Sequence, residues 1–177
     1  MGWTYKVHGG VAAGLGAVVL ALAALSWVRA AAPLLESQWL GVTAFALAFL
    51  SHLSAFARVA VARADKHTLG RAFRCLPGRV RAGLVALIVA GVAMTVFDMV
   101  GARGLQSPEE RDGRYFALDT TPGARGTVEI SKSRYQSLKL SESRWMLGIP
   151  GVLLVAASCA VLAAGEVRRA DESVVAW

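Results

Sequence analysis

The stretch WMLGIPGVLLVAASCAVLAAG, residues 145–165, is the longest of four apolar segments in this chain of 177 residues. The other three occupy residues 10–28, 39–56 and 82–100. A helix needs about 20 mostly apolar residues to cross a bilayer, because each residue advances it by about 1.5 Å. The four segments therefore predict an all-α membrane protein, built as an antiparallel bundle of four transmembrane helices.

Composition supports a lipid environment. Hydrophobic residues make up 55% of the chain, and a soluble domain of this length would have too little polar surface to cover itself. The net charge of +7 could indicate nucleic-acid binding, which requires one continuous basic face. The basic residues lie between apolar segments instead. We therefore expect the lipid bilayer as a partner, and no nucleic acid.

The connector at residues 57–81 indicates how the chain threads. Its basic residues, against the single acid Asp65, are Arg58, Arg63, Lys66, Arg71, Arg74, Arg79 and Arg81. Such a density of bases in a short connector marks the cytoplasmic side. Residues 1–9 and 166–177 are then cytoplasmic, and loops 29–38 and 101–144 are extracytoplasmic. The alternative role of these bases is to bind anionic lipid or a cytoplasmic partner, since each adds about 1 kcal/mol near a membrane surface.

The N-terminal segment allows a second interpretation. The apolar run followed by Ala30, Ala31 and Ala32 resembles a secretory signal cleaved before Pro33. The length of the run favours a retained first span over a signal core of about 7–15 residues. Abundant arginine and alanine indicate a GC-rich bacterial genome, so we expect the cytoplasmic (inner) membrane of a bacterium.

Small residues recur at four-residue spacing in the spans. Gly10 and Gly14 form a G-x-x-x-G pair, and Ala82, Ala86 and Ala90 form a stripe on the third segment. Such stripes let helix backbones approach closely in lipid. We therefore predict that these faces lie between helices.

Ionisable and hydroxyl side chains within the spans are candidate functional groups, because polar groups in the membrane are costly. His52 lies between Ser51 and Ser54 in the second segment, and Asp98 lies near the outer end of the third. A relay of protons or ions needs groups at closer spacing. The structural alternative is a histidine bonded to a serine or a carbonyl, and an aspartate that meets water or pairs with Arg103.

The loop at residues 101–144 carries the polar part of the chain. Residues 101–112 are expected to form a flexible lead-in. Residues 114–118 and 127–130 predict a β-hairpin whose apolar side comprises Phe116, Leu118, Val128 and Ile130. A helix capped by Ser131 or Ser133 should follow and run into the fourth span. Hairpin and helix together would form a small extracytoplasmic cap.

This loop also carries a pattern of residues. A Tyr115-Phe116 strand, a glycine-containing turn, Val128-x-Ile130-Ser131, then Tyr135 and Arg144 precede the final span. The pattern resembles small four-span membrane proteins of actinobacteria, which have no assigned activity. The resemblance implies the topology and no catalytic residue.

The sequence lacks the combinations of side chains that common catalytic sites use. The outer loop holds no histidine or cysteine, so a Ser–His or Cys–His pair cannot be built there. His67 has only Asp65 and Cys75 as nearby candidates, too few for a zinc site. We therefore expect no catalytic residue, metal or cofactor.

The predicted function is that of a non-enzymatic accessory, sensor or protective subunit of the membrane. The cap would present Tyr115, Phe116, Arg134 and Tyr135 to a protein partner. The alternative is a homo-oligomeric transport or pore component, in which His52, Ser51, Ser54 and Thr43 face the lumen.

Overall fold

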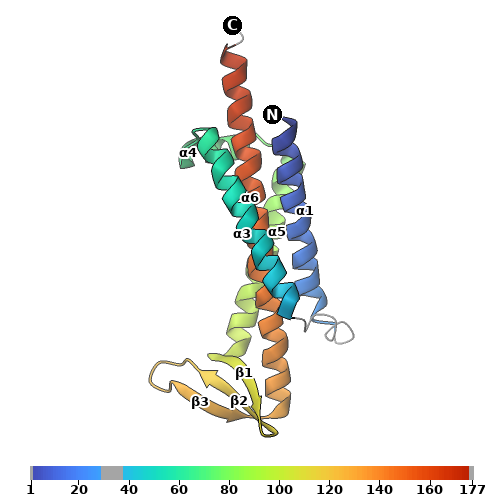
Figure 1. Cartoon of the computed structure of the whole chain (residues 1–177), viewed down its shortest axis with the longest axis vertical. Helices are drawn as coiled ribbons and strands as arrows, with labels where there is room; N and C mark the ends of the chain where they lie inside the picture. The colour runs from blue at the N-terminus through green and yellow to red at the C-terminus, as the bar shows by residue number, and fades with distance from the viewer. Residues whose placement is uncertain (1, 29–37, 176–177) are drawn as a thin grey trace.

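The computed structural model describes residues 2–28 and 38–175 (Figure 1). The chain is mostly helical, and a small sheet lies at one end. The elements in chain order are α1 (Trp3–Leu25), α3 (Gln38–Val61), α4 (Lys66–Arg74), α5 (Gly78–Ala102), β1 (Leu105–Arg111), β2 (Arg114–Asp119), β3 (Gly126–Ile130) and α6 (Lys132–Val175). The predicted outer loop at 29–38 and the cleavage position before Pro33 lie outside the described residues, except for residue 38.

Four helices among the described residues are long and apolar enough to cross a membrane: α1, α3, α5 and α6. Each is longer than its apolar segment, since α1 begins at Trp3 and α5 at Gly78. The predicted helix after Ser131 is confirmed. Ser131 Oγ accepts a hydrogen bond from Arg134 N at 3.3 Å, and α6 continues from there through the fourth apolar segment.

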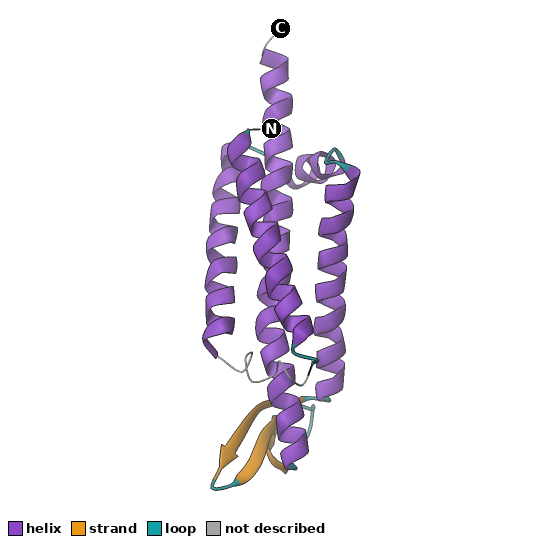
Figure 2. Cartoon of the chain, turned by 90° about the vertical axis from the view of Figure 1, so that its right-hand side faces the viewer, coloured by secondary structure: helices purple, strands orange, loops and turns teal. Residues whose placement is uncertain are grey.

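The core follows α6, which lies in the middle of the molecule. α1, α3 and α5 pack along it, and in the described part of the chain they contact each other much less (Figures 1 and 2). Its most apolar stretch is 61% buried, against 17% for that of α5. The most buried side chains of this core are Leu154, Val155 and Val161, all from α6.

Glycines allow the closest helix contacts. A Cβ on Gly16 would lie 2.7 Å from Val155 Cγ2, and one on Gly91 would meet Val152 and lie 2.8 Å from Leu20 Cδ2. Ser158 Oγ also donates to the carbonyl of Gly9 at 2.7 Å, which joins α6 to α1. These contacts require backbones without a side chain between them.

The predicted small-residue faces are wrong for α1 and α5. Gly10 and Gly14 are exposed, and no described atom lies within 4 Å of a Cβ built on either. The stripe of Ala82, Ala86 and Ala90 is exposed as well. Packing against α6 determines which face of a helix is buried. In α1 the face toward α6 carries Gly9 and Gly16 instead of Gly10 and Gly14.

The described strands form an antiparallel sheet in the order β1-β2-β3. The predicted flexible lead-in is wrong, because most of it forms β1. A tight turn at Asp112 (φ 51°) and Gly113 (φ 75°) pairs Arg111 with Arg114. Positive φ at both positions is typical of the Asp-Gly turn that connects β-hairpins. β1 is polar and lacks period-two alternation, which is why the strand is hard to recognise in the sequence.

The register of the hairpin separates the apolar side chains that were expected on one side. Ala117 pairs with Val128 and Tyr115 with Ile130, so these four share the face toward α6. Phe116 pairs with Glu129 and Leu118 with Thr127 on the opposite face. The predicted single apolar side is therefore wrong. Phe116 and Leu118 lie on the outward face of the sheet.

We predict that Gly91→Ala destabilises the protein by about 1–3 kcal/mol, because the new methyl group overpacks the contact with Val152 and Leu20. Gly83→Ala on the same helix is the matched control, since a Cβ there meets no described atom within 4 Å. Alanine also has the higher helix propensity, by up to about 1 kcal/mol, so the control should be neutral or stabilising. Thermal unfolding in one detergent measures both variants. Equal stability of the two would contradict the packing described for α5 on α6.

Candidate functional site

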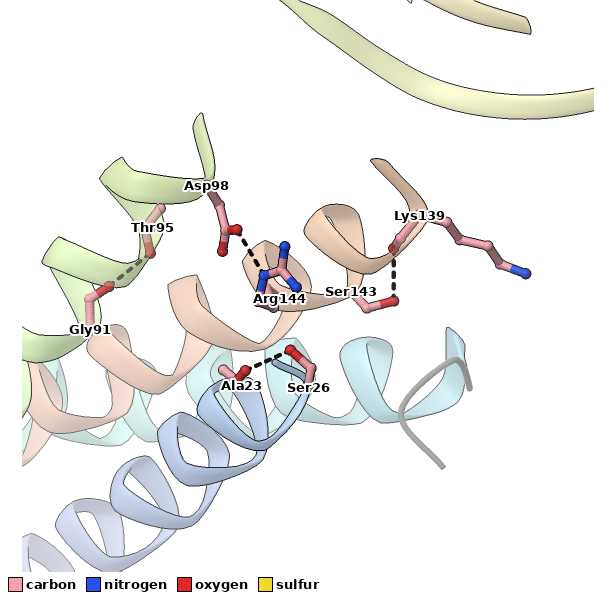
Figure 3. Close-up of polar contacts among 8 residues, drawn as sticks. All are labelled: Ala23, Ser26, Gly91, Thr95, Asp98, Lys139, Ser143 and Arg144. Atoms are coloured by element: carbon pink, nitrogen blue, oxygen red, sulfur yellow. Dashed lines mark hydrogen bonds and ion pairs between the residues drawn. The ribbon is translucent and has the colours of Figure 1, made fainter. Parts of the chain in front are cut away.

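A buried ion pair joins α5 to α6 near the end that carries the sheet (Figure 3). Arg144 Nε donates to Asp98 Oδ1 at 2.7 Å, and the side chains are only 15% and 4% exposed. The predicted pairing of Asp98 with Arg103 is wrong. Arg103 ends α5 in the left-handed conformation (φ 51°) and is exposed. Arg144 lies on the facing helix, where its guanidinium neutralises the carboxylate.

The end of α1 completes this junction. The Arg144 guanidinium lies 6.0 Å from the centre of the Trp27 ring, within reach of a cation–π interaction. Trp27 in turn meets Phe97 of α5 edge to face at 5.9 Å. Ser26 Oγ is buried and donates to Ala23 O at 2.7 Å. One arginine therefore links α6 to the ends of α1 and α5.

A second arginine attaches the sheet end to α5. Arg134 Nη2 donates to Ala102 O at 2.8 Å and to Gly101 O at 3.3 Å. These carbonyls at the C-terminus of a helix have no partner inside the helix and carry a partial negative charge, so a cation is favourable there. Tyr115 packs against Tyr135 at 4.8 Å between ring centres, which holds β2 on α6.

The residues predicted to form the partner surface do not all lie on the same face of the sheet end. Tyr115, Arg134 and Tyr135 are half-buried and hold the sheet on the helices. Phe116 lies on the outward face, next to Leu118. Leu118 was expected on the covered apolar side with Phe116, Val128 and Ile130 and was therefore not among the candidate partner residues. The strand pairing supplies the signal, since Leu118 faces the same way as Phe116.

A cavity of about 210 Å³ lies between β1 and α6, and Pro108, Leu138, Glu142 and Trp145 are among its lining residues. The hydroxyl of Ser141, also at its wall, is buried and lacks a hydrogen-bond partner among the described residues. That oxygen is covered by neighbouring atoms. It therefore lies outside the reach of a molecule in the cavity and indicates imperfect packing rather than a binding contact.

His52 and Ser54, in the C-terminal half of α3, have hydrogen-bond partners inside the molecule. His52 Nδ1 lies 3.0 Å from Ala48 O, and Ser54 Oγ donates to Ser51 O at 3.0 Å. Ser54 Oγ also lies 3.1 Å from His8 Nε2, where it accepts because its one proton is used. His8 was not predicted as a candidate, because it precedes the apolar segment at residues 10–28. In the structure α1 begins at Trp3 and therefore includes His8. Asp98 lies near the other end of the bundle, so the structure does not bring it to His52.

The basic connector contains the short helix α4. Its N-cap is Asp65, whose carboxylate accepts from Thr68 N at 2.7 Å. This backbone N–H lowers the pKa of Asp65, because it stabilises the charged carboxylate. Arg58 lies over the ring of Tyr5 at 4.7 Å, and Arg81 donates to Arg74 O at 2.9 Å.

The other predicted basic residues of the connector point into solvent. Arg63 takes the left-handed conformation (φ 48°) that turns the chain from α3 toward α4. The exposed bases are Arg63, Lys66, Arg71, Arg74, Arg79 and Arg81.

Within residues 2–28 and 38–175, no group of three or more His, Cys, Asp or Glu side chains is arranged to hold a metal ion. Comparison with family models, with curated proteins and with solved structures finds no match to this chain. The resemblance to small four-span actinobacterial proteins therefore stays a prediction.

We predict that Asp98→Ala or Arg144→Ala alone lowers the unfolding free energy by about 3–5 kcal/mol, because each leaves a buried charge without its partner. The double variant should lose clearly less than the sum of the two, since the groups interact directly. Chemical unfolding of the four proteins in one detergent measures the coupling.

The matched control is the exposed pair of Glu109 and Arg111, 2.6 Å apart with side chains 54% and 60% exposed. Its loss should leave the unfolding free energy nearly unchanged, because water replaces an exposed partner. Additive losses at Asp98 and Arg144 would show that the pair does not join α5 to α6.

Proposed function

We propose that this chain is a multi-pass protein of the bacterial cytoplasmic membrane that acts as a non-enzymatic accessory or sensor subunit. Its apolar helices form an antiparallel transmembrane bundle, and its sheet is presented outside the cell to a protein partner. The observation that carries the proposal is that the sheet is built on α6, which also forms the core along which the other long helices pack and runs to the opposite end.

The outward surfaces of the helices support membrane insertion. Large apolar side chains such as Phe49, Leu53 and Phe56 of α3 and Val92 and Phe97 of α5 are exposed. An apolar surface of this extent on a water-soluble monomer would promote aggregation. Lipid tails cover such a surface without cost.

The orientation follows from charge. The bases of α4 and its flanks lie at the end where α1 begins, and the sheet lies at the other end (Figure 1). The excess of bases favours the cytoplasm for the α4 end, so the sheet is outside. Trp27, Trp39 and Trp145 lie toward the sheet end and suit the outer head-group region.

The sheet has the surface of an interaction site. Phe116 and Leu118 form an apolar centre on its outward face, with Leu118 42% exposed. Arg114 and Glu129 lie beside them with their charged atoms 3.9 Å apart. An apolar centre with a charged rim is the usual composition of a protein interface.

The connection through α6 supports a sensor or accessory role. α6 has 44 residues and is about 66 Å long, roughly twice the thickness of the hydrocarbon core. β1 and β2 both contact it, and the Tyr115–Tyr135 contact holds β2 to its first turns. A force on the sheet is therefore carried directly to the cytoplasmic end of the helix.

The oligomeric pore receives less support. Ser54 bonds to His8 inside the monomer, and the exposed side of α3 at that level is formed by Leu53 and Phe56. A pore would need its polar groups on an exposed side. We therefore rank it second; a ring of copies with His52 facing the axis in nanodiscs would reverse the order.

We predict that Cys75, which is exposed in the connector, is protected from a membrane-impermeant maleimide in intact cells. The variant Cys75→Ser with Arg125→Cys should react, because it moves the exposed thiol to the turn between β2 and β3. Both proteins should react after the membrane is opened. Labelling of Cys75 in sealed cells would reverse the proposed orientation.

We predict that a photo-crosslinking amino acid at position 118 forms one defined protein adduct in cells. The same probe at position 125, in the turn, is the matched control and should give little of that adduct. Phe116→Ser should abolish the adduct made from position 118, because it removes the apolar centre. Adducts with lipid alone, or the same adduct from both positions, would count against a partner on this face.

A further inference from the structure

α4 presents a basic hollow at the cytoplasmic end of the bundle. The hollow has a volume of about 400 Å³, and it is lined by Lys66, His67, Gly70, Arg71 and Arg74. We propose that it binds the phosphate head group of an acidic phospholipid from the inner leaflet. The proposal rests on the membrane placement proposed above and adds a specific ligand to it.

The helical period places these residues together. His67, Gly70, Arg71 and Arg74 follow the i, i+3, i+4, i+7 spacing and occupy one face of α4. The other face is apolar: Leu69 and Phe73 pack against the core clusters of the bundle, and Ala72 is buried. The apolar face fixes the rotation of the helix and leaves its basic face outward.

Gly70 gives the hollow its shape. It lies in the middle of the basic face, and a Cβ built on it would meet no described atom within 4 Å. The flanking side chains can therefore close around a ligand that rests on the backbone. A plain topological signal needs bases in the connector but has no need of a space between them.

Charge favours an anion in this space, because none of the described residues that line it carries a carboxylate. The nearest acid along the chain, Asp65, is engaged by Thr68 N at the helix start. Glu166 and Asp171 of α6 line a neighbouring groove that shares Arg71 with the hollow, and there Glu166 lies 3.6 Å from Arg169. Arginine binds phosphate through two parallel hydrogen bonds, so Arg71 and Arg74 supply the strongest contacts.

The position of α4 selects a lipid over a soluble anion. α4 begins shortly after the end of α3 and ends at the start of α5, both apolar enough to span the bilayer. Its basic face therefore lies at the depth of the head groups. The phosphates of the inner leaflet are the anions present there at the highest local concentration.

The test titrates the purified full chain with cardiolipin, phosphatidylglycerol and phosphatidylcholine and measures bound lipid by native mass spectrometry. We expect preference for the two acidic lipids. Each base near the surface contributes about 1 kcal/mol, or about five-fold, so Arg71→Ala with Arg74→Ala should weaken binding about 25-fold. Arg114→Ala with Arg125→Ala removes the same charge from the sheet and is the matched control, with no loss expected.

A second variant separates the hollow from its charge. Gly70→Leu fills the space, keeps every base and meets open surroundings, so it should fold. It should weaken acidic-lipid binding by at least as much as the loss of one arginine, about five-fold. Full binding by Gly70→Leu, or by the double arginine variant, would overturn the proposal.

Soluble anions are tested with inorganic pyrophosphate in the same buffer. Binding of pyrophosphate as tightly as cardiolipin would overturn the assignment to lipid. Reconstitution into phosphatidylcholine vesicles tests the membrane placement separately. A chain that enters these vesicles but shows no lipid preference loses only this inference, whereas failure to enter any bilayer would refute the proposed function.

Discussion

The packing of α1, α3 and α5 along α6 is the constraint on which the rest of the structure depends. The three outer helices have little contact with each other in the described part of the chain, so α6 supplies most of their shared surface. Close approach at Gly16 and Gly91 fixes how each helix is rotated. That rotation decides which side chains are exposed on the outside of the molecule and which face the core, and it brings Arg144 opposite Asp98.

The two ends of the molecule differ in how their charged side chains are arranged. At the sheet end, charge is buried and matched: Arg144 pairs with Asp98, and Arg134 satisfies the last carbonyls of α5. At the α4 end, positive charge is left open around Gly70. Matched charge stabilises a joint between elements, whereas open charge is available to a ligand.

The sequence predicts where the helices lie along the chain better than how they pack against one another. Long apolar runs identify the spans without any knowledge of packing, and a serine before α6 identifies its start. The partner of Asp98 is 46 positions away, and only the facing of two helices brings Arg144 to it. The sequence placed Leu118 on one side with Val128 and Ile130, whereas the register between β2 and β3 puts them on opposite faces. The Asp112-Gly113 turn after β1 is recognisable in the sequence, but the strand itself is not, because its residues are mostly polar.

The central position of α6 also has a consequence for biosynthesis. Chains are made from the N-terminus, so α1, α3 and α5 leave the ribosome before the helix that joins them. Until α6 arrives, these helices share few native contacts, and the arginine that matches Asp98 has not yet been translated. The native assembly is therefore completed at the end of synthesis, and a nascent chain stalled ahead of α6 lacks the helix along which the other three pack.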